Sequence, residues 1–272
     1  MRIGFPIWYG YGDRLQKMIS EAADVGFDYI EVSLDYPWPF RGAYRLEDVI
    51  RDAFDHGLSI AFHAPWRDIR LASPISEVRK TSVKAFEEFM AKVSRYSCDY
   101  VVVHLSSDQA VDRIPQIREE YIASAVKSVK EILSLESLSS LKIVFENVRE
   151  DLDTFKRIVS EAGSEVCLDV SHAICLAARS SKKNKLDEEV KRWIRELGSL
   201  IRVMHFSGLR FMGNWVRDHV IIPKDDRYLK LVKEELRNLN VENFLLEVFE
   251  DPDKGEVHPP QLREVVEFLK KS

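Results

Sequence analysis

The sequence predicts a single (β/α)8 barrel of the TIM type, an α/β fold that occupies residues 1–272 as one domain. Short apolar runs alternate with longer segments of helical period, eight of each, which implies parallel strands joined by right-handed crossovers. The length is typical of a one-domain barrel. No Gly-x-Gly-x-x-Gly loop follows an early strand, which disfavours an open doubly wound sheet. No linker or low-complexity tract divides the chain.

Each expected strand is a run of four to eight residues, and most are rich in Val, Ile and Phe. That composition is typical of parallel strands with both faces buried. The expected strands cover residues 2–8, 29–35, 59–65, 100–106, 142–148, 165–172, 201–208 and 243–249.

The segments between these runs are amphipathic. Residues 13–25, for example, keep Leu15, Met18, Ile19 and Ala22 on one helical face. The polar run at 179–185 (RSSKKNK) is expected to be a solvated loop. The expected helices cover residues 13–25, 46–56, 74–96, 115–135, 153–162, 186–197, 225–239 and 259–271.

The composition is that of an ordinary globular protein, with 45% hydrophobic and 31% charged residues. The net charge of −5 mildly disfavours a function that rests on phosphate contacts, although a local basic stripe is compatible with it. The three cysteines lack CxxC spacing, and Cys98 and Cys167 are expected to be buried, inert thiols. No signal-peptide pattern and no apolar run of about 20 residues is present, so a cytoplasmic protein without a membrane partner is expected.

Polar residues gather where the expected strands end, which is where a barrel carries its chemistry. The segment after the seventh strand adds Asp218 and His219, and Glu31 lies midway along the second strand. One buried histidine is most often a paired core group, but so many ionisable groups at one end indicate a site, because burial is costly unless they are paired or bind metal. The strand ends carry His63, His104, Glu146, Asp169, His172, His205 and Glu247.

Carboxylates and imidazoles without thiolates suit Mn, Co, Mg or Zn in a reactive site rather than a structural zinc site. The donors suffice for one to three divalent ions.

The strand-end motifs, taken in order, resemble those of the xylose isomerase-like barrel superfamily. This superfamily contains endonuclease IV and the sugar or sugar phosphate isomerases and epimerases. The motifs are HAPW at His63, FEN at Glu146, LDVSH at Asp169 to His172, MHFSG at His205 and LLEV at Glu247. The resemblance runs from Arg2 to about Phe249. It implies that one metal ion is coordinated by Glu146, Asp169, His205 and Glu247.

The favoured hypothesis is a divalent-metal-dependent sugar or sugar phosphate isomerase or epimerase. In the epimerase-type members, the residues that match Glu146 and Glu247 also exchange protons on opposite faces of the substrate carbon, so these two glutamates are the expected catalytic residues. The partner would be a small-molecule sugar or sugar phosphate, and a homo-oligomer is compatible with the sequence. Candidate substrate-binding residues are His172, Glu31, Trp66, Arg210 and Asp218, with Trp38 and Trp215 as further stacking candidates.

The alternative hypothesis is an endonuclease IV-like apurinic/apyrimidinic endonuclease, whose partner is nucleic acid. That branch adds metal ligands that match His63, His104 and His172, and an Asp-x-His pair. Here the chain reads Arg217-Asp218-His219, with Arg at the Asp position if His219 is aligned. The Gly-rich loop of that branch is replaced by ENVREDLDTF. These departures disfavour a third ion and the DNA-binding loops of that branch.

Under either hypothesis His63, His104, His172 and His219 are candidates for additional metal ligands. The endonuclease would also need a basic, aromatic-bearing face around the barrel mouth. Its candidate cations are Arg41, Arg45, Arg67 and Arg70.

Overall fold

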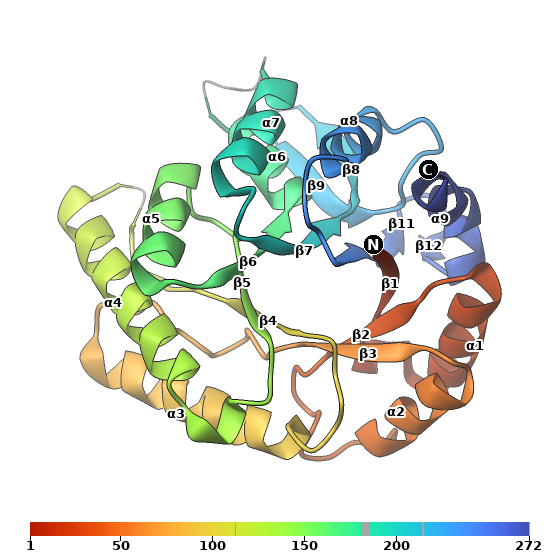
Figure 1. Cartoon of the computed structure of the whole chain (residues 1–272), viewed down its shortest axis with the longest axis horizontal. Helices are drawn as coiled ribbons and strands as arrows, with labels where there is room; N and C mark the ends of the chain where they lie inside the picture. Colours follow the sequence, from red (N-terminus) through yellow and green to blue (C-terminus); the bar gives the residue numbers. More distant parts are fainter. Residues whose placement is uncertain (112, 181–184, 214, 272) are drawn as a thin grey trace.

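The structure, a computed structural model, describes residues 1–111, 113–180, 185–213 and 215–271. Eight parallel strands close into a barrel in the order β1-β10-β7-β6-β5-β4-β3-β2, and the helices surround it (Figure 1). The prediction of a (β/α)8 barrel is therefore confirmed. The barrel strands are β1 (Arg2–Ile7), β2 (Tyr29–Ser33), β3 (Ser59–His63), β4 (Val101–His104), β5 (Ile143–Glu146), β6 (Glu165–Asp169), β7 (Ile201–Phe206) and β10 (Asn243–Leu246).

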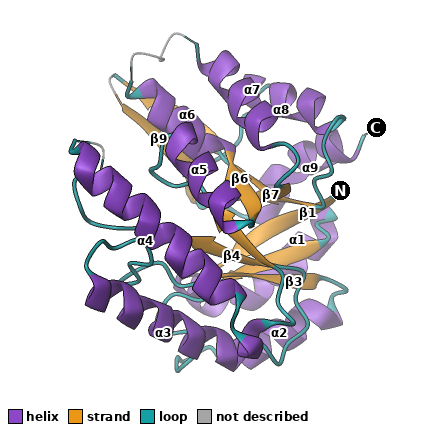
Figure 2. Cartoon of the chain, turned by 60° about the vertical axis from the view of Figure 1, so that its left-hand side comes forward, coloured by secondary structure: helices purple, strands orange, loops and turns teal. Residues whose placement is uncertain are grey.

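The helices form the outer layer, and the view in Figure 2 shows them against the strands that they cover. Most match the predicted segments within a few residues, and short 3-10 turns precede α1 and α9. Among the described residues, no helix is long and apolar enough to cross a membrane. The α-helices are α1 (Leu15–Val25), α2 (Leu46–Asp55), α3 (Ser76–Val93), α4 (Pro115–Leu133), α5 (Leu152–Ala162), α6 (Val170–Ala178), α7 (Leu186–Leu197), α8 (Arg227–Leu236) and α9 (Arg263–Lys270).

The barrel interior begins with a closed layer of fully buried, mostly apolar side chains. Tyr100 donates a hydrogen bond to the Tyr29 hydroxyl across this layer (3.0 Å). Gly4 makes room for the Tyr29 ring, because a Cβ at position 4 would lie 2.2 Å from it. This layer fills the barrel interior below the strand ends. Its members are Tyr29, Ala61, Tyr100, Val102, Val144, Cys167, Val203 and Leu245.

Helix α6 was not predicted, because residues 165–172 were interpreted as one strand. Strand β6 ends at Asp169, whose side chain accepts a hydrogen bond from the backbone N–H of His172 (2.7 Å) and so caps α6. The helix is apolar on nearly all sides because it is buried, so it lacks the helical period that marks a surface helix. The loop predicted at 179–185 lies largely outside the described residues.

A hairpin, also missed, follows β7. Strands β8 (Gly208–Met212) and β9 (Trp215–Val220) pair antiparallel, and β9 continues into a small sheet with β11 (Glu250–Asp251) and β12 (Gly255–Glu256). Apolar and polar residues do not alternate in Trp215–Val220, so the segment lacks the usual strand signal. The hairpin places β9 against α6, beside the strand ends.

Strand register brings the polar strand-end residues to one level. His104 on β4 stands opposite Glu146 on β5, and Asp169 on β6 stands opposite His205 on β7. Since parallel strands present their carboxyl ends at the same rim, these side chains meet inside the barrel mouth.

Candidate metal centre

Four side chains from neighbouring strand ends converge at the centre of the mouth. Glu146, Asp169, His205 and Glu247 each offer a donor atom, and these atoms lie within 4.8 Å of one another. The first three residues are fully buried and Glu247 is 8% exposed. We call these residues the quartet.

Two carboxylate oxygens of the quartet are buried without a hydrogen bond from any described residue: Oε1 of Glu146 and Oδ2 of Asp169. Burying a charged oxygen without a partner is costly, so such atoms call for an explanation. The other oxygen of Asp169 caps α6, which fixes the carboxylate with Oδ2 free. A hard divalent cation would satisfy both orphaned oxygens, so the quartet fits a metal ion.

The ring of His205 is held in one orientation by carboxylates on both sides. Its Nδ1 lies 3.2 Å from Oε2 of Glu247, and its Nε2 lies 3.2 Å from Oε2 of Glu31. Glu31 is 3% exposed and lies against Nε2 of the ring, and its contact with substrate stays a prediction. An imidazole whose Nε2–H donates to a buried carboxylate presents an unprotonated Nδ1 to a metal.

A second donor group lies beside the quartet and shares Glu146. Nε2 of His104 is 2.9 Å from Oε2 of Glu146, and Nε2 of His63 is 3.1 Å from that of His104. The Nδ1 of His63 lies 2.9 Å from the carbonyl oxygen of Ala64. Because a carbonyl only accepts, this Nδ1 carries the proton of the neutral ring, so a neutral His63 presents its Nε2 lone pair to the group. His63, His104 and Glu146 can therefore hold a cation.

A third donor group combines His172 with Asp218 and His219 of β9. His172 donates through Nδ1 to the carbonyl of Asn147 (3.0 Å), and His219 donates through Nδ1 to that of Glu247 (3.2 Å). In their neutral form both rings thus keep Nε2 as an acceptor. Asp218 and His219 belong to one donor group, although they are adjacent in the sequence and not spaced as Asp-x-His.

The backbone of His219 explains how adjacent residues reach one group. Successive side chains of a strand point to opposite faces, so Asp218 and His219 should diverge. His219 instead adopts a left-handed conformation with φ of 55°, which is uncommon for a residue other than glycine. Its N–H donates to Oγ of Ser207 (2.9 Å), which anchors this turn. Arg217, which stands at the Asp position of the Asp-x-His pair, forms an ion pair with Glu250 and is not part of the donor group.

Proton affinities in the mouth reflect how tightly these groups are packed. Burial alone would lower the pKa of His63, but the hydrogen bond and charge of Glu146 outweigh it and raise that pKa to about 9. The pKa of His172 is also about 9, because Asp169 and Glu146 outweigh burial. Burial raises the pKa of Asp169 to about 6. Despite burial, His219 and His205 hold the pKa of Glu247 at about 2.

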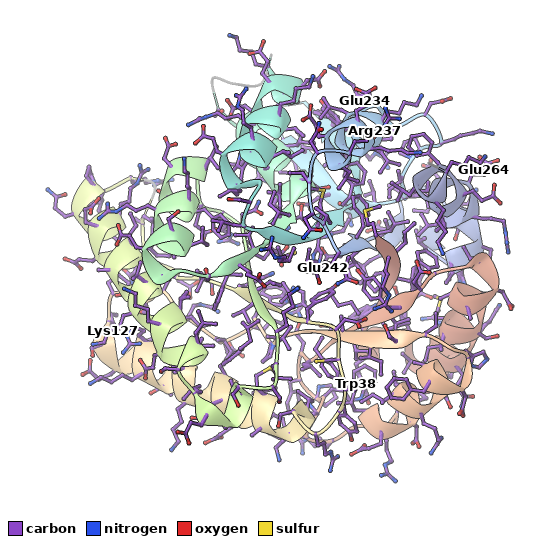
Figure 3. All side chains as sticks on the ribbon, in the orientation of Figure 1. Trp38, Lys127, Glu234, Arg237, Glu242 and Glu264 are labelled. Atoms are coloured by element: carbon purple, nitrogen blue, oxygen red, sulfur yellow. The ribbon has the colours of Figure 1, made fainter. Side chains whose placement is uncertain are left out.

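Other predicted residues lie outside the donor groups. Trp66 is 39% exposed at the mouth, with its ring 5.9 Å from that of His104. Arg210 is exposed on β8. Trp38 is buried and donates through Nε1 to the carbonyl of Tyr44 (2.7 Å); Figure 3 labels its position.

Sequence reasoning missed two residues that shape the site. Asn147 is buried and bonds to the backbone of Asp169 in both directions (2.8 and 2.9 Å), which joins the ends of β5 and β6. Its place directly after Glu146 was the available signal. Cys167 offers a sulfur near Glu146 and His205. Burial raises its thiol pKa well above the usual range, which agrees with the predicted inert thiol.

A family model described as "Xylose isomerase-like TIM barrel" matches residues 19–272. In sequence, the chain is 25% identical over 224 residues to a protein described as probable endonuclease 4 from Natranaerobius thermophilus, which covers 75% of each chain.

Solved structures share the fold at low sequence identity. A D-psicose 3-epimerase from Clostridium cellulolyticum superposes with a TM-score of 0.71 at 15% identity, covering 99% of this chain and 98% of that one. A 3-keto-D-glucoside 4-epimerase from E. coli gives 0.66 at 15% identity, with full coverage of both chains. Endonuclease IV from Thermus thermophilus gives 0.60 at 16% identity, again with full coverage of both.

Proposed function

This chain belongs to the xylose isomerase-like TIM barrel family, and from that premise we propose that it is a divalent-metal-dependent endonuclease acting at abasic sites in DNA. The sequence alone favoured a sugar isomerase or epimerase. The observation that reverses this preference is the presence of two further donor groups beside the quartet. Proton transfer on a sugar needs the quartet alone, whereas hydrolysis of a phosphodiester uses several cations together.

The donor groups are arranged to serve one reacting group. Glu146 turns Oε2 toward His104, and its Oε1 has no hydrogen bond among the described residues, so this residue would serve both the quartet and the second donor group. His172 lies 3.5 Å from Glu146 through Nδ1 and 3.9 Å from Asp218 through Nε2, which links the quartet to the third group. Bound divalent ions would supply Lewis acidity, which activates water and neutralises phosphate charge.

The residues around the mouth suit a nucleic acid. Six exposed aromatic side chains lie on segments that follow barrel strands, where they can stack on bases. Arg41, Arg67 and Arg210 add positive charge at the same end. Arg67 forms an ion pair with Asp35, and Arg70 forms one with Asp108. Phosphate groups would have to compete with these carboxylates for the two arginines. The aromatic residues are Trp8, Tyr36, Phe40, Trp66, Phe211 and Trp215.

A sugar isomerase or epimerase remains the second candidate, because the quartet alone brings Glu146 and Glu247 within 4.8 Å of each other. In that case these glutamates would move the protons, and His172, Trp66 and Arg210 would contact the sugar.

The double variant His63→Ala/His104→Ala separates the two candidates, because it removes the second donor group and leaves the quartet. We expect the variant to lose at least about 100-fold in cleavage of a duplex that carries one abasic site. The matched control is His56→Ala, at the exposed end of α2. Turnover of a ketose by the wild type, unchanged in the double variant and without any cleavage of the duplex, would contradict the endonuclease and support the isomerase.

A further inference from the structure

A side cavity of about 260 Å³ opens next to the second donor group, between the loops that follow β4 and β5. His104 belongs both to the donor group and to the wall of this cavity. A chemical group in the cavity would therefore be the immediate neighbour of a group held at the metal centre.

The cavity walls combine apolar surface with polar edges. Leu105, Val111, Tyr121 and Val148 supply the apolar part. Ser107 and Gln109 add hydrogen-bonding groups. A nucleobase has two apolar faces and a polar edge. The apolar walls can contact the faces of such a ring, and Ser107 and Gln109 can bond to its edge.

The charges at the rim are compatible with a nucleotide. The carboxylate of Glu150 accepts hydrogen bonds from the Tyr121 hydroxyl and from the backbone N–H groups of Val148 and Arg149 (3.0 Å each). Arg70 is bound to Asp108 through Nε (2.6 Å). Arg149 is exposed, and the structure records no ion pair for its guanidinium among the residues it describes. A cation is thus available at the rim.

The loop that borders the cavity after β5 is short. Only residues 147–150 lie between Glu146, at the end of β5, and Asp151, whose side chain caps α5 by accepting from the N–H of Thr154 (2.9 Å). The volume of the side cavity lies below the roughly 300–1,000 Å³ that is typical of pockets for larger ligands. This size suits a single ring system.

We propose that this side cavity binds the nucleobase of the nucleotide adjoining the phosphodiester at the metal centre. The inference rests on the proposed function and extends it: the enzyme would recognise an intact base next to the cleaved bond. Trp66 and Val148 would flank the ring, and Gln109 would meet its edge.

Calorimetric binding of two probes to the zinc-loaded full chain tests this proposal. Thymidine 5′-phosphate carries a base, and 2-deoxyribose 5-phosphate lacks it. We expect thymidine 5′-phosphate to bind about tenfold more tightly, the size of a typical base-stacking contribution. Equal dissociation constants would overturn the proposal.

Two variants that fill the cavity from different walls, Val148→Trp and Gln109→Trp, should each bring the ratio of the two dissociation constants to about one. Their thermal midpoints show whether each variant is folded. Arg237→Ala, on the C-terminal end of α8 in Figure 3, is the control and should keep the ratio.

A ratio unchanged in both folded variants would place the base elsewhere and overturn the proposal. A base-dependent ratio that these variants abolish would support the side cavity even if the chain fails to cleave an abasic duplex, so the two proposals fail separately.

Discussion

Two successive layers of the barrel interior are built on the same strands and differ in chemistry. The lower layer contains Val144, Cys167, Val203 and Leu245. Two residues further along each strand stand the quartet members Glu146, Asp169, His205 and Glu247. The same step leads from Tyr29, Ala61 and Val102 to Glu31, His63 and His104. Since side chains two apart on a strand share a face, all of them point inward.

The comparison separates stability from function. The lower layer is fully buried and makes an apolar floor. The upper layer buries charges and leaves two carboxylate oxygens without hydrogen bonds among the described residues. An arrangement that costs folding free energy and persists in the fold is typical of a functional site. Changes in the two layers should therefore have opposite signatures.

The largest effect is expected from the upper layer. Glu146→Gln keeps the shape of the side chain but removes the charge shared by the quartet and the second donor group. Cleavage of an abasic duplex should fall by about 10³-fold while the chain still folds, because the charge that both donor groups share is lost and the shape of the side chain is kept. Single-turnover cleavage and a thermal scan check this. Activity within tenfold of the wild type would remove Glu146 from the centre.

The lower layer should respond the other way. Leu245→Ala should reduce the free energy of unfolding by about 2–5 kcal/mol, because it opens a cavity in the barrel floor. Metal content should be unchanged. Leu133→Ala, at an exposed position near the end of α4, is the control and should change stability by about 0.5 kcal/mol or less. Denaturant titration measures both variants, and equal stabilities would show that the floor does not carry the fold.

Glu31 lies in the upper layer and reaches the centre only through His205. Glu31→Leu should weaken zinc affinity by about 10–100-fold, because the ring loses the partner that fixes its tautomer. Glu31→Gln keeps an acceptor and should recover part of that loss. Competition with a chromophoric chelator gives the affinities, and the exposed Glu234→Leu serves as the control. If the leucine variant binds zinc like the wild type, Glu31 does not position His205.

The smallest expected effect is the pH dependence of the metal-free chain. The pKa values of His63 and His172 are raised from 6.5 to about 9. Their contribution to stability is complete below pH 6.5 and is lost as the pH rises through 9. The thermal midpoint in chelator should therefore fall by several degrees between these values. The double variant His63→Asn/His172→Asn should flatten this dependence, and a midpoint that rises with pH would contradict the account.

The sequence predicted the barrel and its polar rim because each donor of the quartet ends an apolar run, a local feature. It could not reveal that Glu31 contacts Nε2 of His205, since a strand pattern does not identify the partner of a buried side chain. The third donor group depends on the left-handed backbone of His219, and no residue type announces that conformation. Helix α6 was not predicted because a buried helix lacks the apolar–polar period of a surface helix. The burial of Trp38 was not predicted because a tryptophan after a strand gives the same pattern whether it is buried or exposed.

The number of metal ions per chain tests the central claim most directly. Elemental analysis of protein purified without chelators should give two or three ions per chain, because three donor groups surround the mouth. His63→Ala/His104→Ala should contain one fewer ion than the wild type. A single ion per chain in both proteins would contradict the account and leave the quartet alone as the metal site.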